Sequence, residues 1–188
     1  FGILGNLILN FSKLLKQRPT HTPSAQHVLD EDYYKRIEAI QFTMAHDDGM
    51  RMNEVTNADI ILLGVSRTSK TPTSIYLANR GYKTLNIPLV GTQEIPALLK
   101  REPSNFCIIG LVVEARRLSD IRSNRLEIMR EVNIPNYSNL DFIQTEIEES
   151  KKLFKRYNWP IVDVTRKSVE ETAATAIKIF DIKRKQKK

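Results

Sequence analysis

The chain of 188 residues carries 29 Lys and Arg residues against 22 Asp and Glu residues, so its formal net charge is +7. With 41% hydrophobic and 27% charged residues, its composition is that of a globular domain and excludes a wholly disordered chain. The positive charge suits anionic partners, but it does not choose among nucleotides, phosphoproteins, nucleic acid and acidic membranes. The single cysteine, Cys107, lies in an apolar run, which indicates a buried core position and not a catalytic thiol.

The first 29 residues read differently from the rest. Residues 3–16 place apolar side chains at helical spacing, and the prolines in residues 17–24 indicate a loop. No apolar run approaches the roughly 18 residues that a membrane helix needs, so we expect no membrane partner. The chain begins without Met, so we expect it to start inside a larger protein, with residues 1–29 as the remnant of a further N-terminal region. We treat residues 1–188 as one domain.

From residue 30 onward, the apolar pattern predicts strands and helices in alternation. We predict helices over 31–43, 72–79, 95–100, 118–131 and 141–157 and a last helix from 168, and strands over 58–64, 83–89, 106–113 and 160–164. Asp30 can cap the first of these helices, and Ser168 with Glu171 forms a capping box at the last one. The basic tail 183–188 is expected to be frayed. Strands separated by helices predict an α/β fold with a mostly parallel, doubly wound sheet.

The segment between the first strand and the next helix has a phosphate-binding pattern. It reads Gly64, Val65, Ser66, Arg67, Thr68, Ser69, Lys70 and Thr71. The spacing matches G-x-x-x-x-G-K-[ST], the phosphate loop of nucleotide-binding kinases, except that Ser69 stands at the second glycine. Backbone N–H groups at a helix N-terminus bind phosphate, Lys70 adds a charge, and the Thr71 hydroxyl suits a Mg²⁺ ion.

Ser69 weakens the match, because glycine at this position normally permits a positive φ that serine adopts only at a cost. The alternative is a serine-rich turn that merely caps a helix. The preceding strand and following helix favour a nucleotide site, and Arg67 could clamp a second anion.

Residues 64–78 resemble the signature of the pyruvate, phosphate dikinase regulatory proteins, which share a family with the phosphoenolpyruvate synthase regulatory proteins. The resemblance extends to residues 27–40, to the Asp-Asp-Gly segment 46–49, to residues 79–88 and to residues 169–173, and so covers nearly the whole chain. The segment 79–88 is more similar to the pyruvate, phosphate dikinase branch.

The resemblance implies a bifunctional enzyme with ADP, inorganic phosphate and Mg²⁺ as ligands, working in the cytoplasm. It would phosphorylate a threonine of pyruvate, phosphate dikinase with ADP as donor, and remove that phosphate by phosphorolysis, releasing pyrophosphate. Phosphoenolpyruvate synthase is the alternative target, and a homodimer is left open. We do not expect nucleic acid as a partner, because the basic tail lacks interleaved aromatic residues.

With the family in view, Asp47 and Asp48 are the candidates for the acceptor side. One could take the threonine proton while the other holds a metal or a cation; otherwise they are ordinary turn formers before Gly49. His46 could bind phosphate or shuttle a proton, or it could be a capping histidine. Two further functions remain open: a phosphate-loop kinase of a small metabolite, and a non-catalytic nucleotide-binding module.

Overall fold

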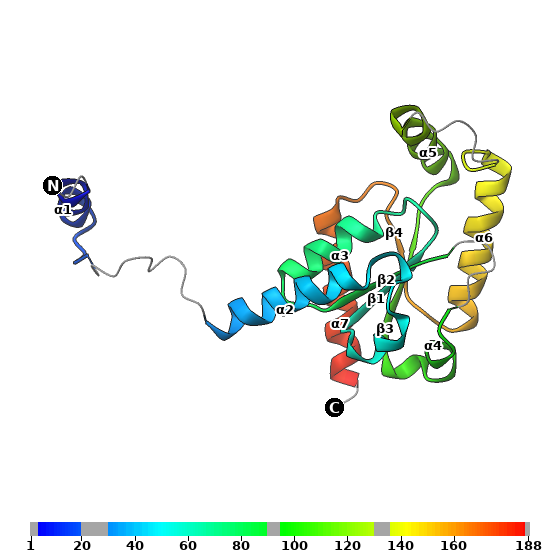
Figure 1. The fold of residues 1–188 in the computed structure, drawn as a ribbon, viewed down its shortest axis with the longest axis horizontal. Coiled ribbons are helices and arrows are strands. Elements are labelled where there is room, and N and C mark those ends of the chain that lie inside the picture. Colours follow the sequence, from blue (N-terminus) through cyan, green and yellow to red (C-terminus); the bar gives the residue numbers. More distant parts are fainter. Residues whose placement is uncertain (1–3, 20–29, 90–94, 130–135, 187–188) are drawn as a thin grey trace.

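The computed structural model describes residues 4–19, 30–89, 95–129 and 136–186. Figure 1 shows the elements in chain order. They are α1 (Gly5–Leu15), α2 (Glu31–Ala45), the 3₁₀ helices η1 (Asp47–Gly49) and η2 (Met52–Asn57), β1 (Ile60–Gly64), α3 (Lys70–Asn79), β2 (Thr84–Pro88), α4 (Ala97–Arg101), the 3₁₀ helix η3 (Pro103–Asn105), β3 (Cys107–Val112), α5 (Ala115–Met129), α6 (Leu140–Arg156), β4 (Ile161–Asp163) and α7 (Val169–Gln186).

The described strands form one sheet in the order β2-β1-β3-β4, and every neighbouring pair is parallel. Ile60 pairs with Thr84 on one side and with Cys107 on the other, so β1 lies inside the sheet. The strands of β1 and β3 are buried along their whole length, as strands covered on both faces must be. The expected parallel α/β fold is confirmed.

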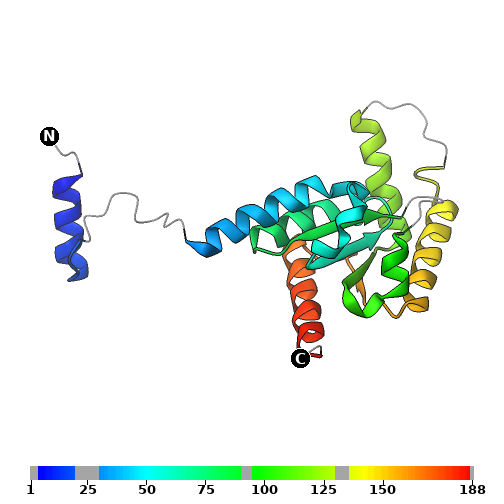
Figure 2. The same cartoon turned by 60° about the horizontal axis from the view of Figure 1, so that its bottom comes forward.

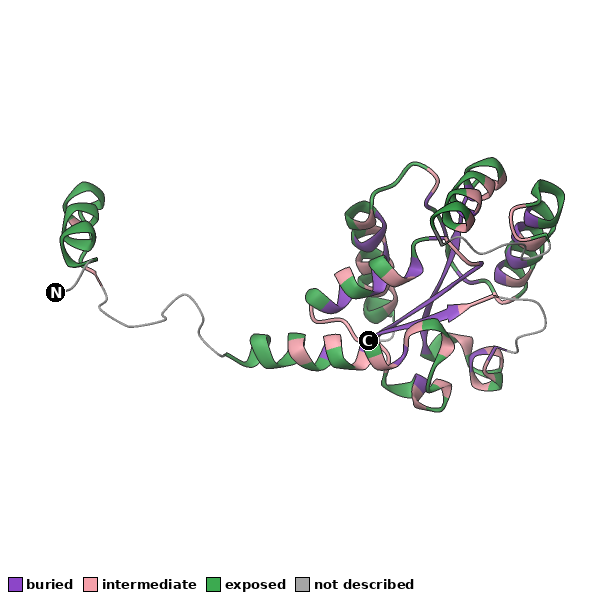
Figure 3. Cartoon of the chain, turned by 45° about the horizontal axis from the view of Figure 1, so that its top comes forward, coloured by how far each residue is buried: buried purple, intermediate pink, exposed green. Residues whose placement is uncertain are grey.

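Helices cover both faces of this sheet, which Figures 2 and 3 show from two further directions. On one face, Ile60, Leu62 and Ile109 pack with buried residues of α3, α5 and α7. On the other face, Ile61 and Ile108 pack with buried residues of η2, α4 and α6. The alternation along each strand therefore divides the core into two layers, which is the arrangement that a doubly wound sheet requires.

Two glycines permit close packing around the inner strands. A Cβ atom on Gly110 of β3 would lie 2.4 Å from the ring of Phe154, so this glycine makes room for the α6 side chain. Gly81 has φ +87° and follows the end of α3, where its N–H bonds to Ala78 O and that of Tyr82 bonds to Leu77 O. A glycine in this left-handed conformation ends the helix.

The predicted caps are confirmed in detail. The Asp30 carboxylate accepts a hydrogen bond from the Tyr33 N–H at 2.8 Å. At α7, the Ser168 hydroxyl accepts from the Glu171 N–H at 3.2 Å, and the Glu171 carboxylate accepts from the Ser168 N–H at 2.8 Å. Both helices therefore begin where the sequence predicts.

Several predicted element boundaries were wrong by two residues or more. α3 begins at Lys70 and not at 72, and α5 begins at Ala115 and not at 118. The tail does not fray at 183, because α7 continues to Gln186 and the Lys183 ammonium donates to the carbonyls of Pro103, at 3.0 Å, and Phe106.

Cys107 is buried in β3, as predicted. Helix α1 forms as predicted, but none of its residues is buried. The adjoining residues 20–29 lie outside the described part of the chain. Among the described helices, none combines the length and the apolar character needed to cross a bilayer.

Candidate functional site

The loop between β1 and α3 folds tightly because of its first residue. A Cβ on Gly64 would lie 2.7 Å from Thr68 Oγ1 and 2.8 Å from the carbonyl oxygen of Leu111 in β3. The loop therefore turns back over its own start, and the Thr68 hydroxyl donates to the Val65 carbonyl at 3.0 Å. Thr68 and Val65 are buried, so these two predicted binding residues form the interior of the loop.

Two loop residues adopt left-handed backbone conformations. Ser69 has φ 59° and Arg67 has φ 71°. The positive φ that the glycine of the pattern would permit is thus adopted by Ser69 directly before α3. Within the described part of the chain, the backbone N–H groups of residues 66–69 donate to no other protein group. Such a run of unengaged N–H groups before a helix is a geometry that binds anions.

Lys70 is buried at the first position of α3, with 5% of its surface exposed. Its ammonium donates to the Val65 carbonyl at 2.9 Å, which places the charge inside the loop. Burial lowers the pKa of Lys70 to about 8, although the charges of Asp48 and Asp47 act in the opposite direction. A phosphate group here would supply the negative charge that this ammonium lacks.

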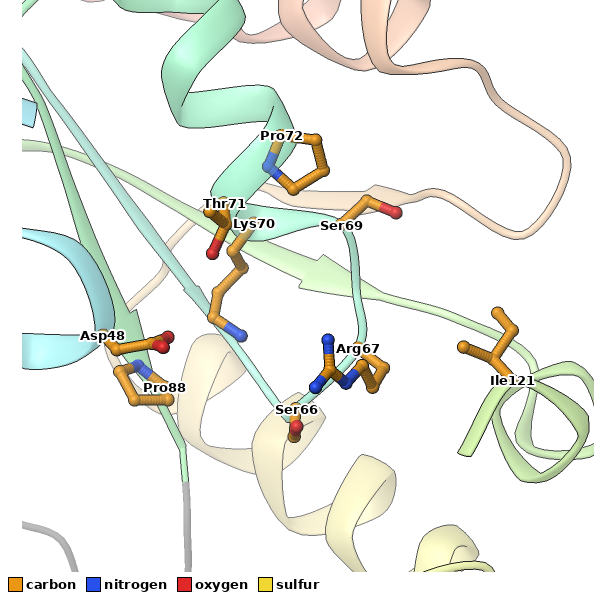
Figure 4. Close-up of a pocket in the computed structure, with 9 residues that line it drawn as sticks. All are labelled: Asp48, Ser66, Arg67, Ser69, Lys70, Thr71, Pro72, Pro88 and Ile121. Atoms are coloured by element: carbon orange, nitrogen blue, oxygen red, sulfur yellow. The ribbon is translucent and has the colours of Figure 1, made fainter. Parts of the chain in front are cut away.

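A cavity of about 470 Å³ opens beside the loop. Figure 4 shows its lining, in which the Lys70 ammonium and the Arg67 guanidinium lie near one another and the Asp48 carboxylate faces them. The lining residues are Asp48, Ser66, Arg67, Ser69, Lys70, Thr71, Pro72, Pro88 and Ile121. Of the eight predicted loop residues, five line the cavity, and Gly64, Val65 and Thr68 support it from within.

The two adjacent aspartates have different surroundings. Asp48 lines the cavity and has φ 50°, a left-handed conformation that turns it away from its neighbour. Asp47 Oδ1 instead accepts hydrogen bonds from Thr71 Oγ1 at 3.2 Å and from Asn86 Nδ2 at 2.5 Å. The structure therefore separates a carboxylate that faces the cavity from one that is bound to the start of α3.

Asn86 is a site residue that the search for motifs missed. It lies in β2, is 1% exposed, and its Nδ2 also donates to Thr71 Oγ1 at 3.1 Å. Its Oδ1 is buried and has no hydrogen-bond partner. Oxygen atoms of Asp47 and Thr71 thus lie together beside the amide nitrogen of Asn86, and oxygen ligands are those that Mg²⁺ prefers. Its position near the carboxyl end of a parallel strand was the available sequence signal.

His46 lies beside Asp47 in the chain but is not part of the cavity lining. It is 1% exposed, its ring stacks on Phe42 with centroids 3.9 Å apart, and its Nδ1 lies 2.7 Å from the Phe42 carbonyl oxygen. Its Nε2 lies 3.4 Å from a carboxylate oxygen of Glu54. These contacts favour a structural position, and a catalytic role for His46 stays a prediction.

A further carboxylate, at the end of β4, lies outside the cavity lining. Asp163 at the end of β4 accepts hydrogen bonds from the N–H and the hydroxyl of Thr165 at 2.8 and 2.5 Å. The pKa of the Asp163 carboxyl is lowered, and the largest cause is the hydrogen bond from the Thr165 hydroxyl. Burial acts in the opposite direction, and the hydrogen bond from the Thr165 N–H lowers the pKa further. Asp163 thus caps the turn that follows β4.

Fold and site together define a parallel α/β protein with a cationic cavity at the carboxyl end of β1, suited to a phosphate-bearing ligand. A family model described as kinase/pyrophosphorylase matches residues 1–177, and the chain belongs to this family.

The chain is similar to proteins that bear the name "Putative pyruvate, phosphate dikinase regulatory protein". One from Pelagibacter ubique (strain HTCC1062) is 64% identical over 182 residues, which is 97% of this chain and 66% of the relative. One from Bartonella bacilliformis is 49% identical over 164 residues, 87% of this chain and 58% of the relative. The chain therefore spans two thirds or less of the length of these relatives.

Proposed function

We propose that this chain carries the catalytic site of a bifunctional kinase and phosphorylase that acts on pyruvate, phosphate dikinase. The observation that supports it is the shared cavity, where two cations, Lys70 and Arg67, face the carboxylate of Asp48 beside a loop of unengaged N–H groups. Cations and N–H groups neutralise a diphosphate, and a carboxylate can accept a hydroxyl proton. A cavity for binding alone would need no carboxylate facing the anion.

In the kinase direction, the donor is ADP and the acceptor is a threonine of the dikinase. The threonine hydroxyl oxygen attacks the β-phosphorus of ADP, the bond from that phosphorus to the bridging oxygen breaks, and AMP leaves with the bridging oxygen. The hydroxyl proton passes to Asp48, the one aspartate of the pair that lines the cavity. Lys70 and Arg67 bind the oxygens of the transferred group, where negative charge is concentrated.

In the reverse regulation, inorganic phosphate removes the phosphoryl group from phosphothreonine. A phosphate oxygen attacks the phosphothreonine phosphorus, the bond to the threonine oxygen breaks, and pyrophosphate forms. Protonated Asp48 can return the proton to the leaving threonine oxygen. Both reactions then use the same anion-binding loop, and in each of them the cavity holds two phosphate groups.

We propose that a Mg²⁺ ion binds beside the loop. Asp47, Thr71 and Asn86 would hold it, and a half-turn of the Asn86 amide would exchange its nitrogen for the unpartnered Oδ1. When bound, the ion would neutralise phosphate charge. We expect Asp47→Asn to weaken Mg²⁺ binding to the ADP complex by about tenfold, measured by titration calorimetry.

The deciding experiment uses purified pyruvate, phosphate dikinase and labelled nucleotides. We expect ADP and not ATP to label the dikinase on threonine, and inorganic phosphate to release the label as pyrophosphate. Because the chain spans only part of its relatives, the Pelagibacter relative serves as a positive control for the dikinase preparation. Labelling from ATP, or transfer to a small metabolite in place of the dikinase, would refute the proposal. Phosphoenolpyruvate synthase, tested in parallel, identifies the other target, and the cytoplasmic location stays a prediction.

A further inference from the structure

A buried arginine outside the cavity lining connects helix α5 to the phosphate loop. Arg122 is 1% exposed, and its guanidinium reaches three separate segments of the chain. Its Nη2 donates to the Ser66 carbonyl at 3.2 Å, and its Nη1 donates to the Tyr137 carbonyl at 3.0 Å and to the Glu146 carboxylate at 2.8 Å. A buried charge is tolerated where it is paired and hydrogen-bonded, so these contacts fix the loop to α5 and α6.

Tyr137 contacts both the Arg122 guanidinium and the loop. Its ring lies against Arg122, with the guanidinium carbon 4.8 Å from the ring centroid. Its hydroxyl oxygen accepts a hydrogen bond from Arg67 Nε at 3.3 Å and lies 3.5 Å from Ser66 Oγ. The hydroxyl therefore contacts two neighbouring residues of the loop, both of which line the cavity.

The electrostatics of Tyr137 agree with this arrangement. Burial raises the pKa of its phenol, but the hydrogen bonds with Ser66 and Arg67 and the charges of Arg67 and Arg122 outweigh burial, so the pKa lies below its usual value. The oxygen of Tyr137 thus sits in a positive environment created by the two arginines.

The hydrogen bond from Arg67 to the Tyr137 hydroxyl uses the Nε atom of the guanidinium, and this choice of atom affects phosphate binding. A free arginine side chain loses up to about 2 kcal/mol of rotamer entropy when it is fixed on a ligand. Tyr137 engages Nε, so the two terminal nitrogens of Arg67 remain available toward the cavity, where Figure 4 shows the guanidinium beside Lys70. An arginine held in this way has its bidentate fork oriented before the phosphate arrives.

We propose that Tyr137 and Arg122 are positioning residues, which hold Ser66 and Arg67 so that Arg67 is the second phosphate-binding cation of the cavity. This inference rests on the proposed binding of ADP. Neither residue lines the cavity, so we expect neither to contact the nucleotide. Each acts through the loop, Tyr137 through the Arg67 side chain and Arg122 through the Ser66 carbonyl.

A double-mutant cycle on ADP affinity tests the proposal by titration calorimetry with ADP and Mg²⁺. We expect Tyr137→Phe to weaken ADP binding by about fivefold to tenfold, and to have no further effect in the Arg67→Ala background. Tyr76→Phe is the matched control, since its hydroxyl also accepts from an arginine, Arg80, at 3.0 Å, but on the outer part of α3. It should leave the affinity unchanged. An equal loss in both backgrounds would overturn the proposal.

Two further measurements distinguish positioning from general damage. Arg122→Lys keeps a charge but loses the fork, and we expect a raised KM for ADP with a smaller change in kcat; an unchanged KM would count against the role of Arg122. A spectroscopic pH titration of Tyr137, identified by its loss in Tyr137→Phe, needs no nucleotide. We expect its pKa to rise in Arg67→Ala, and an unchanged pKa would refute the contact.

The two proposals fail in different ways. If the wild-type chain binds ADP and the cycle shows the coupling, but no phosphoryl group reaches the dikinase, the proposed reaction fails and the positioning role stands. If the kinase is active and Tyr137→Phe matches the wild type in affinity and KM, the positioning role alone fails. A wild-type chain with no affinity for ADP refutes both.

Discussion

Replacing Lys70 with methionine should stabilise the fold while weakening ADP binding, because the two effects have different physical origins. The ammonium is buried with one protein partner, the Val65 carbonyl, and burial lowers the Lys70 pKa from 10.5 to about 8. A difference of about 2.5 units between the unfolded and folded states corresponds to about 3 kcal/mol, by which the protonated lysine disfavours folding. Methionine keeps most of the buried apolar stem.

The net gain is smaller than this figure. Losing the hydrogen bond to Val65 leaves a buried carbonyl that still accepts from Thr68, and such a loss costs about 1 kcal/mol. We therefore expect Lys70→Met to raise the free energy of unfolding by about 2 kcal/mol at pH 7, measured by urea denaturation. ADP affinity should fall by about 10-fold to 100-fold, since one charge-assisted contact to phosphate is removed.

The pH dependence provides the sharper test. Below about pH 8 both the folded and unfolded chains carry the Lys70 proton, so the full penalty applies. Between pH 8 and 10.5 the unfolded chain binds more protons than the folded one, so wild-type stability rises relative to Lys70→Met. The gain from the substitution should therefore shrink across this range, and other titrating groups cancel in the difference. A substitution that destabilises the protein equally at pH 7 and pH 9.5 would refute the reasoning.

Three other substitutions test single features. Asp48→Asn should lower kcat by about 100-fold or more without raising the KM for ADP, because it removes the proton acceptor but no phosphate ligand; retained kcat in a steady-state assay would count against Asp48. Ser69→Gly removes a left-handed serine at φ 59° and should raise the free energy of unfolding by up to about 1 kcal/mol, measured by urea denaturation. A lower free energy of unfolding would show that Ser69 is unstrained. Gly110→Ala brings a Cβ to 2.4 Å from the Phe154 ring and should lower thermal stability by about 3 kcal/mol; unaltered melting would mean that α6 shifts freely.

What could be predicted from sequence was local in origin. Apolar periodicity located the strands, and Asp30 and the capping box located the starts of two helices, because each of these signals acts within a few residues. The predicted ends of α5 and α7 were wrong because their polar residues do not contribute to the apolar periodicity. Polar Arg116 and Arg117 open α5 without contributing to an apolar stripe, and the basic end of α7 forms because Lys183 reaches the carbonyls before β3.

The rest of the site depends on contacts between distant residues, which no local pattern specifies. Tyr137 meets Arg67 and Arg122 meets Ser66 across 70 and 56 positions of the chain. His46 shows the opposite error, since proximity in sequence to the aspartates suggested proximity to the ligand. The end of α2 directs its ring onto Phe42 and into the protein instead.

The strand order explains why these separate pieces meet at one place. From β1 the chain continues to β2 on one side and later to β3 on the other, so the order reverses at β1, and the carboxyl end of such a strand is where open α/β sheets bind ligands. β1 leads into the loop that lines the cavity, β2 carries Asn86, and the helix after β3 carries Ile121 and Arg122. Both cations belong to the segment that follows β1, and contacts from other elements fix that segment in place: Asn86 of β2 donates to Thr71, and Arg122 of α5 donates to the Ser66 carbonyl. That rigidity favours a preorganised site for charge, which phosphoryl transfer requires more than any covalent step by the protein.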